Sequence, residues 1–136
     1  QGGDGTPKPI SENFKMADIK NSLNAALKID GCLGVALVDF ESGLCLGVAG
    51  SPGFDLELAA AGNADVVRAK QSIKNKLGLK AKIEDILITL GSQYHLIRMV
   101  GTNMFIYCAL DRAKANLAMS RKELATIEKN LDVDRG

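Results

Sequence analysis

The chain has 136 residues, of which 46% are hydrophobic and 24% are charged, a composition typical of one globular domain with one hydrophobic core. Its net charge of +1 excludes the strong general attraction to nucleic acids and membrane surfaces that highly basic proteins show. No stretch approaches the roughly 18 consecutive apolar residues of a membrane helix, and three widely spaced cysteines do not indicate a disulfide framework. We therefore expect a cytoplasmic protein.

Residues 1–15 are rich in glycine and proline and predict a flexible tail. They are polar and show no apolar segment of the kind found in signal peptides. Because a helical pattern begins at Met16, we interpret residues 1–15 as an expression remnant, with a native disordered arm as the alternative. The expected domain spans residues 16–131, and residues 132–136 form a polar C-terminal end.

A one-faced apolar stripe predicts a first helix that begins near Met16, with Ser11 or Asn13 as its cap, and ends before Gly31. Its apolar positions are Met16, Ile19, Leu23, Ala26 and Leu27. Residues 32–38 are apolar at every position, which predicts a strand that is covered on both faces. Residues 44–49 are expected to pair back on it as a hairpin.

A long middle helix is expected from about residue 56 to about residue 76, with Asp55 as its N-cap. It carries two neighbouring apolar stripes that are rich in small residues, so we expect a wide face that approaches other backbones closely. One stripe is Ala59, Gly62, Val66, Ala69, Ile73 and Leu77, and the other is Leu56, Ala60, Asn63 and Val67.

Three apolar runs with short glycine-containing breaks follow, at residues 83–90, 94–100 and 104–110. This spacing predicts a three-stranded antiparallel meander. A last helix is expected to begin at a cap formed by Asp111. Its stripe is Ala113, Leu117, Ser120, Leu124, Ile127 and Leu131.

The order of the predicted elements and the two fully apolar strands predict the sheet topology. Strands that are apolar on both faces belong at the centre, so the first and fifth strands should be neighbours. The expected fold is an α/β sandwich of the α+β type, with a five-stranded antiparallel sheet of order 2-1-5-4-3. The first and last helices cover one face, and the middle helix covers the other.

Dimensions predict that one face of this sheet is left half bare. Five strands span about 20 Å, whereas a helix with its side chains is only about 10 Å wide. The third strand is an edge with neither proline nor lysine between Glu84 and Leu90, and an unguarded edge beside a bare apolar face predicts a pairing site. We expect a two-fold homodimer through this strand and the middle helix. The expected interface residues are Val66, Ile73, Ile86, Ile88 and Leu90, although periodicity does not say which parity of the strand faces the helix.

We find no sequence pattern for a catalytic, metal or cofactor site. His95 is the only histidine, and no nucleophile or acidic orienter is apparent beside it, so a structural role is expected. The cysteines Cys32, Cys45 and Cys108 lack the close pairing of a metal site and are expected to be buried thiols. The segment 50–53 precedes a helix but lacks the Gly-Lys-Ser/Thr ending of a phosphate-binding loop.

Six cations between Arg68 and Lys82 are interrupted by no acid. Three interpretations remain open for them: a solvated helix end, a docking surface for an acidic protein, or a contact with nucleic acid. The last has no aromatic interleaving and no DNA-binding motif to support it, so no nucleic-acid partner is expected.

Residues 31–38, 84–89 and 93–98, together with the order of the elements, resemble the roadblock family of the dynein-light-chain and bacterial gliding-motility regulator type. The resemblance covers residues 16–131 and implies a profilin-like fold, dimerisation and binding to Ras-like small GTPases. It implies a non-enzymatic scaffold that modulates the nucleotide cycle of such a GTPase. The alternative is a ligand-sensing domain with a pocket between the middle helix and the sheet, left by the small residues Ala59, Gly62 and Ala69. The expected partner-docking face on the middle helix consists of Asp65, Arg68, Lys70, Gln71 and Lys74.

Overall fold

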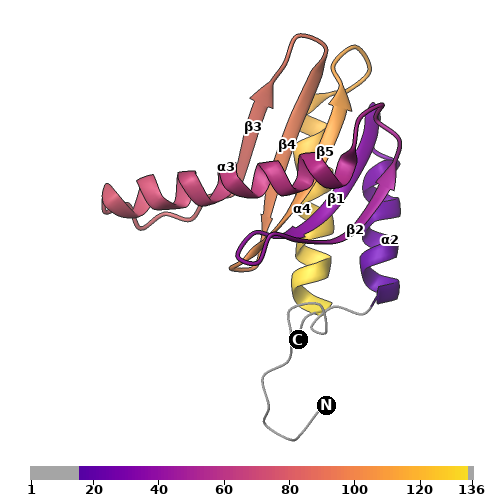
Figure 1. The fold of residues 1–136 in the computed structure, drawn as a ribbon. Coiled ribbons are helices and arrows are strands. Elements are labelled where there is room, and N and C mark those ends of the chain that lie inside the picture. Colours follow the sequence, from indigo (N-terminus) through magenta and orange to yellow (C-terminus); the bar gives the residue numbers. More distant parts are fainter. Residues whose placement is uncertain (1–15, 135–136) are drawn as a thin grey trace, which may run out of the picture.

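A computed structural model describes residues 16–134, so the N-terminal tail and its suggested caps Ser11 and Asn13 lie outside the described part. The elements in chain order are α2 (Met16–Leu27), β1 (Cys32–Asp39), β2 (Leu44–Gly50), α3 (Leu56–Lys76), β3 (Asp85–Thr89), β4 (Gln93–Val100), β5 (Met104–Asp111) and α4 (Leu117–Asp134). The strands form one antiparallel sheet of order β2-β1-β5-β4-β3, which confirms the predicted topology. Figure 1 shows α3 crossing one face and α2 with α4 on the other.

The sheet separates two hydrophobic clusters, and the two strands at its centre contribute to both. Side chains of β1 and β5 alternate between the α2/α4 layer and the α3 layer, which is why both strands are apolar throughout. The cluster under α2 and α4 includes Leu23, Leu37, Ile106, Leu124 and Leu131. The cluster under α3 includes Val38, Ala60, Val67, Phe105 and Tyr107.

The long helix α3 is capped by Asp55, whose carboxylate accepts a hydrogen bond of 3.0 Å from the backbone N–H of Leu58. Of its two predicted stripes, the structure places only the second against the sheet, where Leu56, Ala60 and Val67 are buried and Ala64 joins them. The first stripe faces away from the sheet from Gly62 onward. Its exposed members are Gly62, Val66, Ala69, Ile73 and Leu77.

The last helix begins later than predicted. Asp111 is the final residue of β5, and its carboxylate accepts a hydrogen bond from the N–H of Ala113 within a turn. Asn116 caps the helix instead, because its side chain accepts a hydrogen bond from the N–H of Met119. The helix also continues to Asp134, so three of the residues assigned to a polar end are helical.

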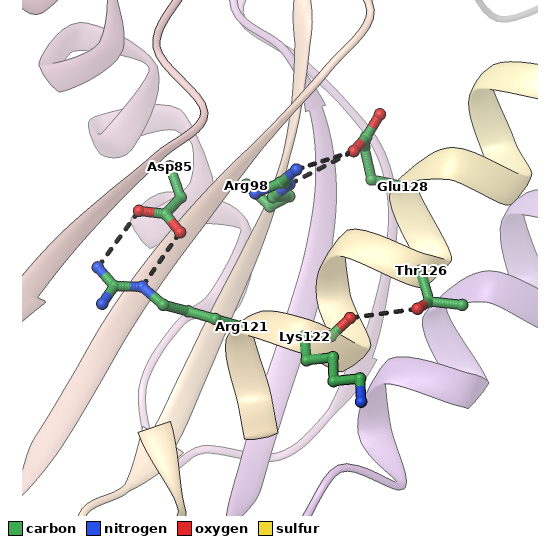
Figure 2. Close-up of polar contacts among 6 residues, drawn as sticks. All are labelled: Asp85, Arg98, Arg121, Lys122, Thr126 and Glu128. Atoms are coloured by element: carbon green, nitrogen blue, oxygen red, sulfur yellow. Dashed lines mark hydrogen bonds and ion pairs between the residues drawn. The ribbon is translucent and has the colours of Figure 1, made fainter. Parts of the chain in front are cut away.

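Two ion pairs tie α4 to the strands beneath it (Figure 2). Arg98 on β4 lies 3.2 Å from Glu128, and both side chains are largely buried, with 17% and 14% of their surface exposed. Arg121 contacts Asp85 at the start of β3 through two nitrogens, at 3.1 and 3.3 Å. The first pair therefore ties α4 to β4, and the second ties α4 to the start of the edge strand β3.

Replacing Glu128 with alanine should lower the free energy of unfolding by about 2–3 kcal/mol, because it leaves the largely buried Arg98 guanidinium without its carboxylate. Urea denaturation followed by circular dichroism measures this. Glu123→Ala, at an exposed position on the same helix, is the control and should change stability by less than about 0.5 kcal/mol. Equal losses in the two variants would show that the ion pair contributes nothing specific.

Candidate interaction face

The face of the sheet that carries α3 is only partly covered. The C-terminal half of α3 extends past the edge strand β3 in Figure 1. Ile86 packs into the cluster beneath α3, so the alternation of the strand places Ile86 and Ile88 on this face, and Leu90 follows directly after the last residue of the strand. The structure thereby shows which alternate side chains of β3 face α3, a point that the sequence periodicity left open. Ile86 and Ile88 are half-buried, and Leu90 is 42% exposed.

Exposed large apolar side chains concentrate on α3, on the segments that flank it and at the end of β3. The residues are Phe54, Leu58, Val66, Ile73, Leu77, Leu79 and Leu90, and we call this set the apolar face. Only Leu44, Val48 and Met119 are comparably exposed elsewhere in the described part of the chain. This concentration makes the apolar face a candidate interaction surface, because isolated proteins rarely leave large apolar patches in water.

The backbone beside this face is also unpaired. β3 is hydrogen-bonded to β4 on one side and is the last strand of the sheet on the other. Its five residues, Asp85 to Thr89, include neither a lysine nor a proline, the usual guards of an edge strand. The predicted interface residues on β3 and α3 therefore border a free edge on one side and exposed apolar side chains on the other.

The structure does not bring the five predicted docking residues together on one surface. Asp65 and Arg68 form an ion pair on one flank of α3, and Arg68 also donates to the carbonyl of Phe40. Lys70 is exposed on the other flank, at the rim of the apolar face. Gln71 and Lys74 turn toward the sheet and are half-buried, which is a correction to the outward orientation that the sequence suggested.

Two hollows lie at the C-terminal end of α3, and the sequence analysis missed both. One, of about 200 Å³, is lined by Gln71, Lys74, Lys82, Ile83, Met99, Gly101 and Thr102. The other, of about 250 Å³, is lined by Lys70, Ile73, Lys74, Leu77, Leu79, Ala81 and Ile83. The mixture of three lysines with Leu77, Leu79 and Ile83 over residues 76–83 could have indicated an apolar, lysine-rimmed segment here.

Of the three small residues that were expected to leave a ligand pocket, Ala59 packs against the cluster beneath α3, and the other two face away from the sheet. Gly62 and Ala69 are exposed, and a Cβ atom added to Gly62 would meet nothing within 4 Å. These positions therefore open the outer surface of α3 and do not form a cavity beneath it.

His95 is held on the same face of the sheet as Ile88, its partner across the strands. Its Nδ1 lies 3.1 Å from the hydroxyl of Tyr107 and its Nε2 lies 2.8 Å from Oε1 of Gln93. A neutral ring that accepts from the tyrosine O–H and donates to the amide satisfies both contacts. Burial lowers the pKa of His95 and raises the pKa of Tyr107 to about 12, so both groups are uncharged near neutral pH. This arrangement has neither a nucleophile nor an acid as a third member.

The glycine-rich turn ahead of α3 has a structural role. The backbone N–H of Ser51 in the glycine-rich turn donates to the carbonyl of Leu33, so it is not free to bind an anion. Residues 16–134 contain no cluster of three metal-binding side chains. Across the same range, no helix is both long and apolar enough to cross a bilayer.

No family model and no curated protein matches the sequence. Similarity appears with solved structures. The chain resembles MglB of Myxococcus xanthus with a TM-score of 0.80 and 16% identity, over 94% of this chain and 92% of that chain. It resembles the gliding protein MglB of Thermus thermophilus with a TM-score of 0.75 and 15% identity, over 96% and 94% of the two chains. It also resembles a Roadblock/LC7 domain of Streptomyces avermitilis with a TM-score of 0.67 and 14% identity, over 90% and 94%. These likenesses and the confirmed strand order show that this chain has the fold of the Roadblock/LC7 domain.

Proposed function

We propose that the protein is a non-enzymatic homodimeric scaffold that binds a Ras-like small GTPase and modulates its nucleotide cycle. The observation that carries this proposal is the apolar face of α3 beside the unpaired edge of β3. In the proposed dimer, β3 pairs with β3 of a second copy, and the two α3 helices lie together over one continuous sheet.

Burial of the apolar face supplies the favourable free energy for this association. Each valine, leucine or isoleucine that is fully buried contributes about 1.5–3 kcal/mol, and the face offers several such side chains at 39–70% exposure. This sum must exceed the cost of lost translation and rotation, which is estimated at about 4–15 kcal/mol. The backbone hydrogen bonds of β3 add specificity, because they fix the direction of the paired strands.

Gly62 supports a close approach of the two helices. A glycine inside a helix lowers the stability of the helix by about 1 kcal/mol relative to alanine. Within one copy no neighbouring atom requires a glycine at this position, because the space beside Gly62 is open. With Ala69 on the same stripe, it lets a second helix come near the α3 backbone.

The choice of a small GTPase as partner rests on the resemblance to the roadblock family. One of the similar structures is described as a gliding protein and another as MglB in a tetrameric arrangement. In the proposed complex, the GTPase supplies the phosphoryl chemistry, and the scaffold biases its switch loops. The exposed cations Lys70, Lys76, Lys80 and Lys82 at the end of α3 provide positive charge for an acidic partner surface.

The direct experiment is a pull-down from the native cell, followed by nucleotide exchange and hydrolysis assays with the purified GTPase. We expect binding that depends on the bound nucleotide and a changed exchange or hydrolysis rate. The scaffold alone should hydrolyse no GTP. Hydrolysis by the scaffold alone, or the absence of any GTPase among specific partners, would contradict the proposal.

Charge reversal at Lys70 and Lys76 should weaken binding to the GTPase about tenfold while the dimer persists, and the loss should shrink at high salt. These positions are exposed, whereas the ammonium of Lys74 donates to the carbonyl of Leu79 and is kept unchanged. Lys122→Glu with Lys129→Glu, at exposed positions on α4, is the matched control. Affinity measured by titration calorimetry should fall only in the first pair, and an equal fall in both would place the partner elsewhere.

A further inference from the structure

Two of the three cysteines approach each other across neighbouring strands. The sulfur of Cys32 on β1 lies 3.5 Å from the sulfur of Cys108 on β5. Cys32 is half-buried, and Cys108 is fully buried among the residues under α2 and α4. One thiol therefore belongs to a partly exposed residue, and the other touches it from inside the core.

An irregularity in the strand register lets the backbone beside this pair adjust. Val35 pairs with Cys108, and Cys32 pairs with Leu110, with a register shift between Cys32 and Gly34. The chain thus bulges beside Cys32, where the ladder is interrupted and the backbone can adjust. A disulfide bond of about 2.05 Å requires the sulfurs to close by only roughly 1.5 Å.

The two thiols differ in acidity, because the pKa of one is lowered and the pKa of the other is raised. The hydrogen bond from Cys108 lowers the pKa of Cys32, although burial acts in the opposite direction. The same hydrogen bond, together with burial, raises the pKa of Cys108. Cys32 is also the more exposed of the two residues, so we assign it as the nucleophile of the pair.

We propose that Cys32 and Cys108 are a peroxide-reactive thiol pair that closes to an intramolecular disulfide. The Cys32 thiolate attacks one oxygen of hydrogen peroxide, the O–O bond breaks, and hydroxide leaves, which gives a sulfenic acid. The sulfur of Cys108 then attacks the sulfenic sulfur, the S–O bond breaks, and the hydroxyl leaves as water with the Cys108 proton. The two thiols supply the two electrons that reduce the peroxide, and a small-molecule thiol can restore them.

Cys45 serves as an internal comparison. Its sulfur lies 3.6 Å from the carbonyl of Gly47 on its own strand, and burial raises its pKa. It packs against the α3 cluster on the other side of the sheet from Cys32 and Cys108. The reactive pair also lies away from the apolar face, so this inference stands apart from the proposed dimer and GTPase.

The test uses the full chain, first reduced and then treated with a small excess of hydrogen peroxide. We expect the intact mass to fall by two hydrogens, the number of free thiols to fall from three to one, and a Cys32–Cys108 crosslink in peptide mapping after cleavage at Glu41. The bond closes a loop with a separation of 76 residues, so thermal unfolding should shift upward by roughly 5–15 °C. Cys45→Ser should behave like the wild type.

Two variants separate the steps. Cys108→Ala should leave Cys32 as a sulfenic acid that a dimedone probe labels, and Cys32→Ser should show neither the label nor the disulfide. Because Cys32 is only half-buried, the second variant keeps the test valid if the first fails to fold. Three thiols remaining after peroxide treatment, preferential oxidation of Cys45, or crosslinks between copies only would overturn the proposal.

Discussion

Replacing Val66 and Ile73 together with glutamate is expected to convert the protein from a dimer into a monomer throughout the micromolar range. Val66 is 39% exposed and Ile73 is 49% exposed, so both side chains reach water in a single copy and can carry a charge without disturbing its fold. In the proposed dimer they lie between two α3 helices, where an unpaired carboxylate would be desolvated at a cost of several kcal/mol. We expect the dissociation constant to rise by at least about a thousandfold.

Light scattering coupled to size exclusion measures this change, and Met119→Glu is the matched control. Met119 is 48% exposed on α4, on the opposite face of the sheet, so its substitution adds one carboxylate at a comparable exposure. The control should remain a dimer, and both variants should keep the wild-type circular dichroism spectrum. If Met119→Glu dissociates the dimer and the Val66/Ile73 variant does not, the interface lies on the α2/α4 face.

Replacing Gly50 with alanine should lower the free energy of unfolding by about 3 kcal/mol or more. Gly50 ends β2 with φ at 94°, a backbone conformation that a side chain disfavours. A Cβ atom there would lie 2.6 Å from the carbonyl oxygen of Leu33 and 2.8 Å from the Cα of Gly34. These are backbone atoms of β1, so the clash can be relieved only by moving the strand or the segment that leads into α3.

Gly53→Ala separates backbone strain from crowding. Gly53 has a similar φ of 90°, but an added Cβ would meet nothing within 4 Å. Its substitution should therefore cost only about 1–2 kcal/mol. Urea denaturation of the two variants tests the difference, and equal losses would show that the contact with Leu33 is unimportant.

The sequence predicted most of the fold because the relevant signals are local and strong. Asp55 caps α3 as expected, since an aspartate directly before an apolar helical stripe is a strong N-cap signal. The fully apolar patterns of β1 and β5 placed them at the centre of the sheet, because only a central strand is covered on both faces. The start of α4 was wrong because both Asp111 and Asn116 are good caps, and only the length of β5 distinguishes them.

The candidate site was less accessible to prediction, since it depends on the rotation of one helix. Gln71 and Lys74 follow Val67 at spacings of four and seven, which places them on the sheet side of α3 despite their polarity. Their long side chains can lie beside the sheet while the polar ends reach water or a carbonyl, so polarity alone misassigned them. The closeness of Cys32 to Cys108 depends on a register shift that no sequence period reveals.

Sedimentation equilibrium of the unmodified protein, from low to high micromolar concentration, tests self-association through the apolar face most directly. The proposed dimer predicts one species of twice the 14.4 kDa chain mass at the upper end of the range, with reversible dissociation only on dilution. A single species of 14.4 kDa at every concentration would contradict the proposed dimer and show that the apolar face does not bind a second copy of the chain.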